Sequence, residues 1–181
     1  MAYKNFLSRL GISILLGLIY YCATYNNYFL FSLATIIYVI ILFEIKYFFR
    51  EFFITITSYL LISYFCFCLY FFKFFDFFDF NILVFSIILF DSFSYLAGIL
   101  IGKNYIFNKI SPKKTFEGYV GGFILTNLIM ITFLLVLEKN INLVYFIFFI
   151  NFIIFFSIIG DLIQSYFKRK NHIKDSSSFL P

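Results

Sequence analysis

The sequence predicts an all-α, polytopic integral membrane protein of about six transmembrane helices, with both termini in the cytoplasm. Its 181 residues are 63% hydrophobic and 13% charged, whereas soluble domains are usually about 45–50% apolar and about 25% charged. Several apolar runs reach the roughly 17–25 residues that a membrane-spanning helix needs. These runs are apolar on both faces, whereas barrel strands alternate polar and apolar residues, so helices are favoured over a β-barrel.

The six expected helices follow one another with short polar connections. Their expected bounds are 7–24, 28–45, 52–72, 81–102, 118–137 and 143–167. Both prolines, Pro112 and Pro181, lie outside these runs, so no span contains a helix-breaking residue. No internal repeat or flexible linker divides the chain, and a single membrane domain over residues 1–181 is the simplest organisation. Within this domain, residues 1–80 carry no recognisable motif.

Basic residues are concentrated on one side of the six-helix arrangement. The proposed cytoplasmic segments hold twelve of them: Lys4, Arg9, Lys46, Arg50, Lys103, Lys109, Lys113, Lys114, Lys168, Arg169, Lys170 and Lys174. The opposite side holds two, Lys73 and Lys139. This bias places both termini in the cytoplasm. The net charge of +5 is spread over short loops, so anionic headgroups or phosphates are expected partners and nucleic acid is not.

A first group of polar residues lies along the fourth expected helix. Its members occupy positions i, i+3, i+4, i+7 and i+11 and share one helical face: Asp91, Ser94, Tyr95, Gly98 and Gly102. A carboxylate inside a membrane span is costly unless it pairs, binds a cation or faces water. The pattern indicates either a helix-packing stripe with Asp91 in an ion pair or one wall of a polar site.

The loop that follows carries more polar residues into the fifth expected helix. It reads Ser111-Pro112-Lys113-Lys114-Thr115-Phe116-Glu117-Gly118. Thr115 and Glu117 are suited to cap the new helix. Lys113 and Lys114 add positive charge near a helix N-terminus, where backbone N–H groups favour anions. The loop therefore predicts a phosphate-binding segment at the membrane surface, and lysines that only anchor the topology are the alternative.

A second polar group lies where the sixth expected helix leaves the membrane. Asp161, Ser165 and Lys168 are spaced i, i+4 and i+7 on one face, with Arg169 one position round. A carboxylate near the headgroups is a natural Mg²⁺ ligand, because that ion prefers one or two carboxylates plus substrate phosphates. Lys168, Arg169 and Lys174 would then bind phosphate. The alternative is a capping aspartate beside a basic stop-transfer cluster.

These motifs resemble the phosphatidate cytidylyltransferase family, also called CDP-diacylglycerol synthases, from about residue 88 to the end. The family signature S-x-x-K-R-x4-K-D-x-[GSA]-x2-[LIF]-P is matched by Ser165, Lys168, Arg169, Lys174, Asp175, Ser177, Phe179 or Leu180, and Pro181. The family's S-P-K-K-T-W-E-G loop is matched from Ser111 to Gly118, with Phe116 in place of Trp. Other matches are Gly160-Asp161 and the Asp91–Gly98 stripe, and Gln164 stands where the family commonly has Glu.

The resemblance implies that CTP and phosphatidic acid react to CDP-diacylglycerol and pyrophosphate. It implies catalytic roles for Asp161, Lys168 and Ser165, with Asp161 as the Mg²⁺ ligand. The substrate-binding residues that it implies are Asp91, Ser111, Lys113, Lys114, Thr115, Glu117, Arg169, Lys174 and Asp175. The implied setting is a bacterial inner membrane with the active site on the cytoplasmic face, and a homodimer is left open.

In the family a second metal-binding aspartate follows in a D-R-x-D segment, which would lie beyond Pro181. We therefore expect the 181-residue chain alone to have little or no activity. Three origins of the early end stay open: a naturally short protein, a gene fragment, or a frameshifted reading of a longer gene. Three other functions stay open: a non-catalytic phosphatidate-binding remnant, a CTP-using lipid kinase, and a cation-coupled transporter that uses Asp91 and Asp161. Clustering of the polar residues at one membrane face argues against the transporter.

Overall fold

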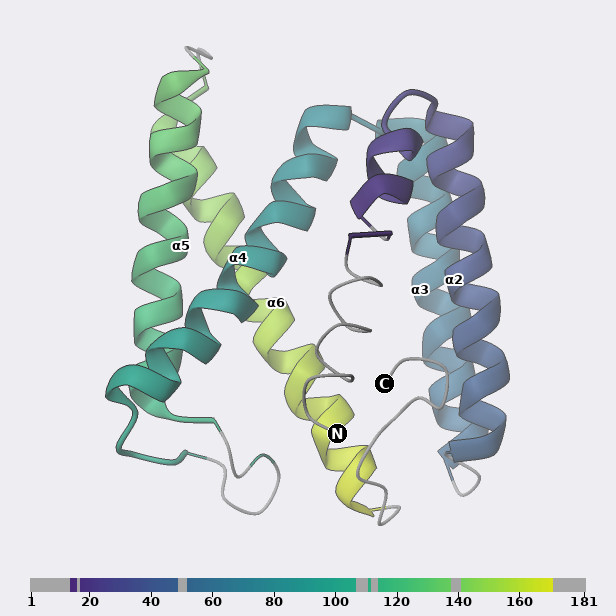
Figure 1. The fold of residues 1–181 in the computed structure, drawn as a ribbon. Coiled ribbons are helices and arrows are strands. Elements are labelled where there is room, and N and C mark those ends of the chain that lie inside the picture. Colours follow the sequence, from purple (N-terminus) through teal and green to yellow (C-terminus); the bar gives the residue numbers. More distant parts are fainter. Residues whose placement is uncertain are drawn as a thin grey trace. The chain divides into compact units, whose positions relative to one another are not determined.

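The computed structural model confirms an all-helical chain within the residues that it describes, which are 14–15, 17–48, 52–106, 111, 114–137 and 141–170. Figure 1 labels five helices: α2 (Asn27–Phe48), α3 (Phe53–Phe74), α4 (Phe77–Ile101), α5 (Phe116–Val136) and α6 (Leu143–Lys170). Residues 14–15 and 17–23 are also helical. They form the described part of the first expected helix, whose beginning lies outside the described residues.

Four of the described helices, α3, α4, α5 and α6, are long and apolar enough to cross a membrane, and α2 contains a shorter apolar stretch. The chain is therefore an integral membrane protein. Helix α4 begins at Phe77, four residues before the expected start at residue 81. The Asp76 carboxylate explains the difference, because it accepts a hydrogen bond of 2.6 Å from the backbone N–H of Phe78 and caps the helix.

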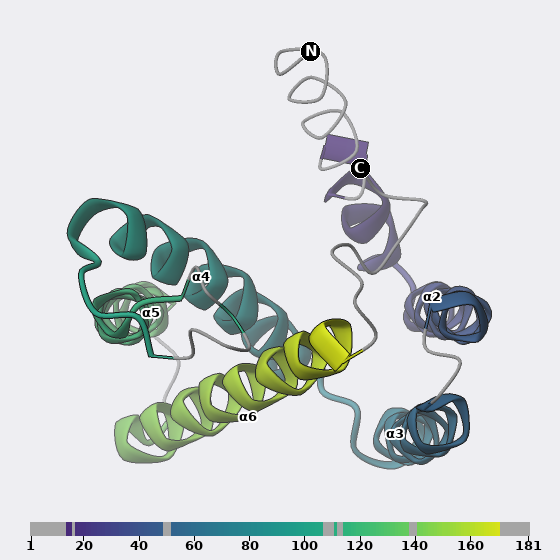
Figure 2. The same cartoon turned by 90° about the horizontal axis from the view of Figure 1, so that it is seen from below.

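The chain divides into two compact units, one built on α2 and α3 and the other on α4, α5 and α6. In the first unit, α2 and α3 lie side by side (Figures 1 and 2). Their contact is aromatic: the ring centroid of Phe31 lies 5.9 Å from that of Phe67 and 4.8 Å from that of Phe71. Helices α2 and α3 carry none of the predicted site residues.

In the second unit, α4 and α5 pack against each other in opposite directions through small residues. The buried residues of α5 recur at every fourth position: Gly118, Gly122, Thr126, Met130 and Leu134. A Cβ atom added to Gly122 would lie 2.8 Å from Ser94 Cβ, and one on Gly118 would lie 2.8 Å from the Ser94 carbonyl oxygen. A four-residue repeat lets the ridges of two helices interlock, and glycine lets their backbones approach closely.

Helix α6 completes this unit by packing on both partners. The three helices share one hydrophobic core, made of Ile82, Phe90, Met130, Leu134, Phe146, Ile150 and Ile154. The Asn127 side-chain amide on α5 also donates a hydrogen bond of 2.9 Å to Asn151 Oδ1 on α6. Figure 2 looks nearly along α5, and α4 and α6 cross the view lengthwise. This arrangement brings Asp161 near the C-terminal end of α6 to the same end of the unit as the loop between α4 and α5 (Figure 1).

Candidate active site

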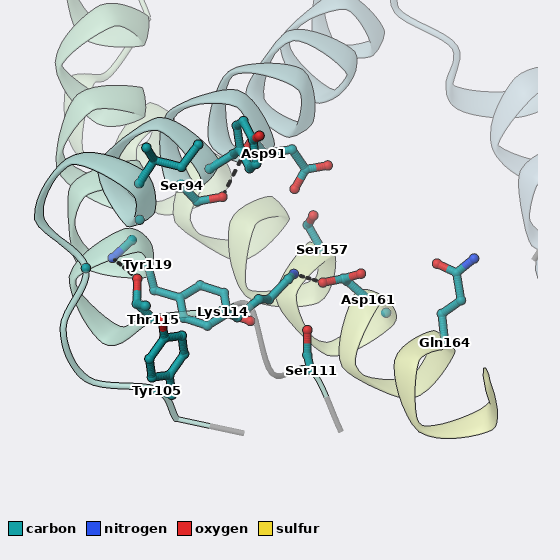
Figure 3. Close-up of a pocket in the computed structure, with 16 residues that line it drawn as sticks. Asp91, Ser94, Tyr105, Ser111, Lys114, Thr115, Tyr119, Ser157, Asp161 and Gln164 are labelled. Carbon is teal, nitrogen blue, oxygen red and sulfur yellow. Dashed lines mark hydrogen bonds and ion pairs between the residues drawn. The ribbon is translucent and has the colours of Figure 1, made fainter. Parts of the chain in front are cut away.

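The loop end of the second unit contains an open pocket of about 910 Å³, shown in Figure 3. Its described lining residues come from all three helices and the α4–α5 loop: Asp91, Ser94, Tyr95, Gly98, Ile99, Gly102, Tyr105, Ser111, Lys114, Thr115, Gly118, Tyr119, Ser157, Gly160, Asp161 and Gln164. Among them, two carboxylates and one ammonium group are charged, which gives the pocket a net charge of −1 (−2 + 1).

The stripe predicted on α4 lines this pocket as a whole, since all five of its members belong to the lining. The same face packs against α5, where Gly98 lies so close that an added Cβ atom would be 3.2 Å from Thr115 Oγ1. The Ser94 hydroxyl donates a hydrogen bond of 3.1 Å to the backbone carbonyl of Asp91. One stripe therefore packs against α5 and lines the pocket. The ion pair of Lys114 is with Asp161 and not with Asp91.

The described ends of the α4–α5 loop are held together by backbone and side-chain hydrogen bonds. Thr115 is the N-cap of α5, as predicted, and its Oγ1 accepts a 3.2 Å hydrogen bond from the Gly118 N–H. The Glu117 carboxylate accepts hydrogen bonds of 3.1 Å from the backbone N–H groups of Lys103 and Asn104, and one of 2.6 Å from the Asn104 side chain. Glu117 does not line the pocket. Its contacts instead fasten the loop that carries Ser111 and Lys114.

Lys114 reaches from this loop to α6 (Figure 3). Its ammonium group forms an ion pair with Asp161 Oδ2, an oxygen that is buried, and the two side chains are 32% and 37% exposed. The Lys114 Nζ atom also lies 5.4 Å from the centre of the Tyr119 ring. Burial lowers the pKa of Lys114, and the negative charge of Asp91 opposes that shift. The Lys114 ammonium group therefore forms an ion pair with Asp161 on α6 and interacts electrostatically with Asp91 on α4.

The face of α6 that lines the pocket shares only Asp161 with the predicted stripe of Asp161, Ser165 and Lys168. Ser157, Gly160, Asp161 and Gln164 line it at positions i, i+3, i+4 and i+7. Sequence reasoning missed Ser157 and Gln164 as site residues. Their signal was available, because a polar residue four positions before Asp161 and another three positions after it share its helical face.

The remaining predicted residues lie elsewhere on the chain. Ser165 is on α6 but is not part of the pocket lining. Lys168 and Arg169 stand in the last turn of α6, beyond the lining. Lys113, Lys174 and Asp175 lie outside the described residues.

The carboxylate oxygens of the pocket suit a Mg²⁺ ion whose other ligands are water and phosphate oxygens of a bound molecule. Within the described ranges, no cluster of three or more His, Cys, Asp or Glu side chains could hold a metal on its own. Asp91 and Asp161 nevertheless line one pocket, and Asp161 Oδ2 is buried against a cation. Because Mg²⁺ usually takes one or two carboxylates and completes its shell with water and phosphate oxygens, these residues suit such a site.

Helices long enough to span a membrane, together with a pocket that holds two carboxylates and a lysine, define a membrane protein with a charged pocket at one end of its second unit. The chain belongs to the cytidylyltransferase family, whose model matches residues 2–181. This membership confirms the resemblance inferred from the motifs.

Individual relatives are phosphatidate cytidylyltransferases. The protein of Staphylococcus haemolyticus is 36% identical over 91 residues, which are 50% of this chain and 35% of that protein. The Bacillus subtilis protein is 36% identical over 91 residues, 50% of this chain and 34% of its own length, and that of Staphylococcus aureus (strain COL) is 36% identical over 92 residues, 50% and 35%. The chain thus matches about a third of the length of these relatives. No solved structure matches it significantly.

Proposed function

We propose that this chain functions in the transfer of a cytidylyl group from CTP to phosphatidic acid, a step of phospholipid synthesis. A phosphate oxygen of phosphatidic acid attacks the α-phosphorus of CTP, the bond from that phosphorus to the bridging oxygen of the β-phosphate breaks, and pyrophosphate leaves with the electron pair. The observation that supports this most strongly is the meeting of Asp91, Lys114 and Asp161 in one pocket of a chain from the cytidylyltransferase family.

The pocket offers groups for both the charged and the apolar parts of such substrates. Lys114 supplies a cation for phosphate, and Ser111 and Ser157 supply hydroxyl donors. Tyr95 and Ile99 line the pocket and yet are 69% and 63% exposed on a membrane-spanning helix. These two side chains would receive the glycerol and acyl part of phosphatidic acid, while the polar groups bind its headgroup.

In this proposal Asp161, assisted by Asp91, holds Mg²⁺, which neutralises phosphate charge when it is bound. Lys168 and Arg169, one to two turns beyond the pocket-lining part of α6, bind phosphate oxygens at the rim. Ser165 supports them there. The active site faces the cytoplasm, in agreement with the basic residues of the α4–α5 loop and of the α6 end.

The test is equilibrium binding with purified chain in nanodiscs that contain phosphatidic acid. We expect Mg²⁺-dependent binding of radiolabelled CTP, and loss of that binding in Asp161→Asn. Asp76→Asn is a charge-matched control, because Asp76 caps the other end of α4, is not part of the pocket lining, and can be replaced as an N-cap by asparagine. Binding of phosphatidic acid without any binding of CTP would overturn the proposal and favour the non-catalytic alternative.

A further inference from the structure

The Lys114 ammonium group lies next to Asp161 Oδ2. That oxygen is buried and is therefore poorly hydrated, so a cation beside it is strongly favoured. A divalent cation approaching Asp161 must compete with Lys114 for the same oxygen. The ion pair thus blocks the group that the proposed function assigns to metal binding.

The charge of the pocket lining does not favour a nucleotide by itself. The described lining residues carry a net charge of −1 when Lys114 is protonated, so they repel a polyphosphate. A divalent cation bound at Asp161 would change the sum to +1 (−1 + 2) and would neutralise that carboxylate. The Lys114 ammonium group would then be available to an incoming phosphate.

We propose that Lys114 is an exchangeable counter-ion, which pairs with Asp161 as in this structure and moves to a phosphate of the nucleotide when a divalent cation takes its place. The inference rests on the proposed function, because it uses Asp161 as the metal ligand. It adds that Lys114 and the metal compete for Asp161. Binding of the metal to Asp161 and binding of phosphate to Lys114 are then coupled in one step.

The surroundings of Lys114 allow this exchange without rebuilding the pocket. The ammonium lies 5.4 Å from the Tyr119 ring centre, and that ring stacks on Phe90 of the core with centroids 6.3 Å apart. An aromatic face attracts a cation in many positions, so the ammonium can move across it. The flexible four-carbon stem of lysine supplies the reach. The backbone of Lys114 stays fixed, because its N–H donates to the Ser111 carbonyl at 3.2 Å.

The test measures Mn²⁺ binding by electron paramagnetic resonance, in the absence of nucleotide and of turnover. Removing the competing cation in Lys114→Met should tighten Mn²⁺ binding about tenfold, within the usual range of coupling between two ligands. The same variant should bind CTP at least about tenfold more weakly, because a phosphate contact is lost. Lys114→Arg keeps the charge and should keep the weak Mn²⁺ binding. Lys103→Met, whose side chain is outside the pocket lining, should behave as the wild type.

Two results separate this inference from the proposed function. If Mn²⁺ binds to the wild type and is lost in Asp161→Asn, but Lys114→Met binds it no more tightly, Lys114 is not a competing counter-ion and the inference fails alone. If Asp161→Asn binds Mn²⁺ as the wild type does, Asp161 is not the metal ligand, and the metal part of the proposed function fails with the inference. A size-exclusion profile and circular dichroism spectrum like those of the wild type identify variants that are folded.

Discussion

The close packing of α4 on α5 makes a sharp prediction for Gly122→Ala. The new Cβ atom would lie 2.8 Å from Ser94 Cβ and 3.0 Å from its Cα atom. Carbon atoms in contact are normally about 3.5–4.0 Å apart, so the helices must separate by about 1 Å. Neither neighbouring atom is the far end of a flexible side chain. The separation therefore has to come from the backbones.

The magnitude follows from what is known of overpacked cores. Such insertions cost about 1–3 kcal/mol, which outweighs the up to about 1 kcal/mol that alanine gains over glycine inside a helix. Gly160→Ala is the matched control, because an added Cβ atom there meets nothing within 4 Å. The same chemical change should therefore destabilise the protein at Gly122 and leave it equally or more stable at Gly160.

The measurement is reversible unfolding by sodium dodecyl sulfate in mixed micelles. The chain has no Trp, so far-ultraviolet circular dichroism is the suitable signal. Equal midpoints for Gly122→Ala and the wild type would show that α4 and α5 are not packed this closely. An equal loss of stability in Gly160→Ala would show that the effect comes from the loss of glycine itself. Either outcome would refute the reasoning.

Three further predictions concern other contacts of the second unit. Glu117→Ala should make the α4–α5 loop more sensitive to trypsin at Lys103, with Glu117→Gln intermediate because one acceptor oxygen remains; equal cleavage rates would contradict the fastening of the loop by Glu117. Asn151→Leu should lower the free energy of unfolding by about 0.6–2 kcal/mol by removing the hydrogen bond to Asn127, and a double-mutant cycle with Asn127→Leu that shows no coupling would disprove it. Burial lowers the pKa of Lys114, so between the folded-state pKa and the ordinary value of 10.5 the unfolded chain binds more protons and stability rises with pH. In Lys114→Met the free energy of unfolding should no longer rise with pH over this range. An unchanged slope of that free energy against pH would show that Lys114 does not titrate there.

The helices were predictable because apolar length and capping are local properties of the sequence. Four of the five labelled helices begin within two residues of the expected positions. The exception is α4, where the apolar run is interrupted by Asp79, yet Asp76 caps the helix before it. Two aspartates three residues apart, Asp76 and Asp79, lower the hydropathy and favour a loop, whereas the N-cap hydrogen bond of Asp76 begins the helix there.

The site was predictable where the helical period alone decides which residues share a face. The α4 stripe lies in the pocket as a whole, because its five residues fall on one side of the helix. On α6 several faces contain polar residues, and only packing against α4 and α5 selects the one with Ser157 and Gln164. The partner of Lys114 was not predictable either. Lys114 and Asp161 are separated by 46 residues, and only the packing of α6 on the other two helices brings them into contact.

The order of the three charges along the chain also matters for biosynthesis. Ribosomes make Asp91 first, then Lys114, and finally Asp161. A carboxylate held alone at the centre of a bilayer costs about 2.5–3.5 kcal/mol on insertion scales. Since Lys114 is synthesised before α6, the lining residues from α4, α5 and their loop carry one negative and one positive charge and are neutral together. The second carboxylate joins a site that already has its cation, so no stage of synthesis leaves both carboxylates in the membrane without an ammonium group beside them.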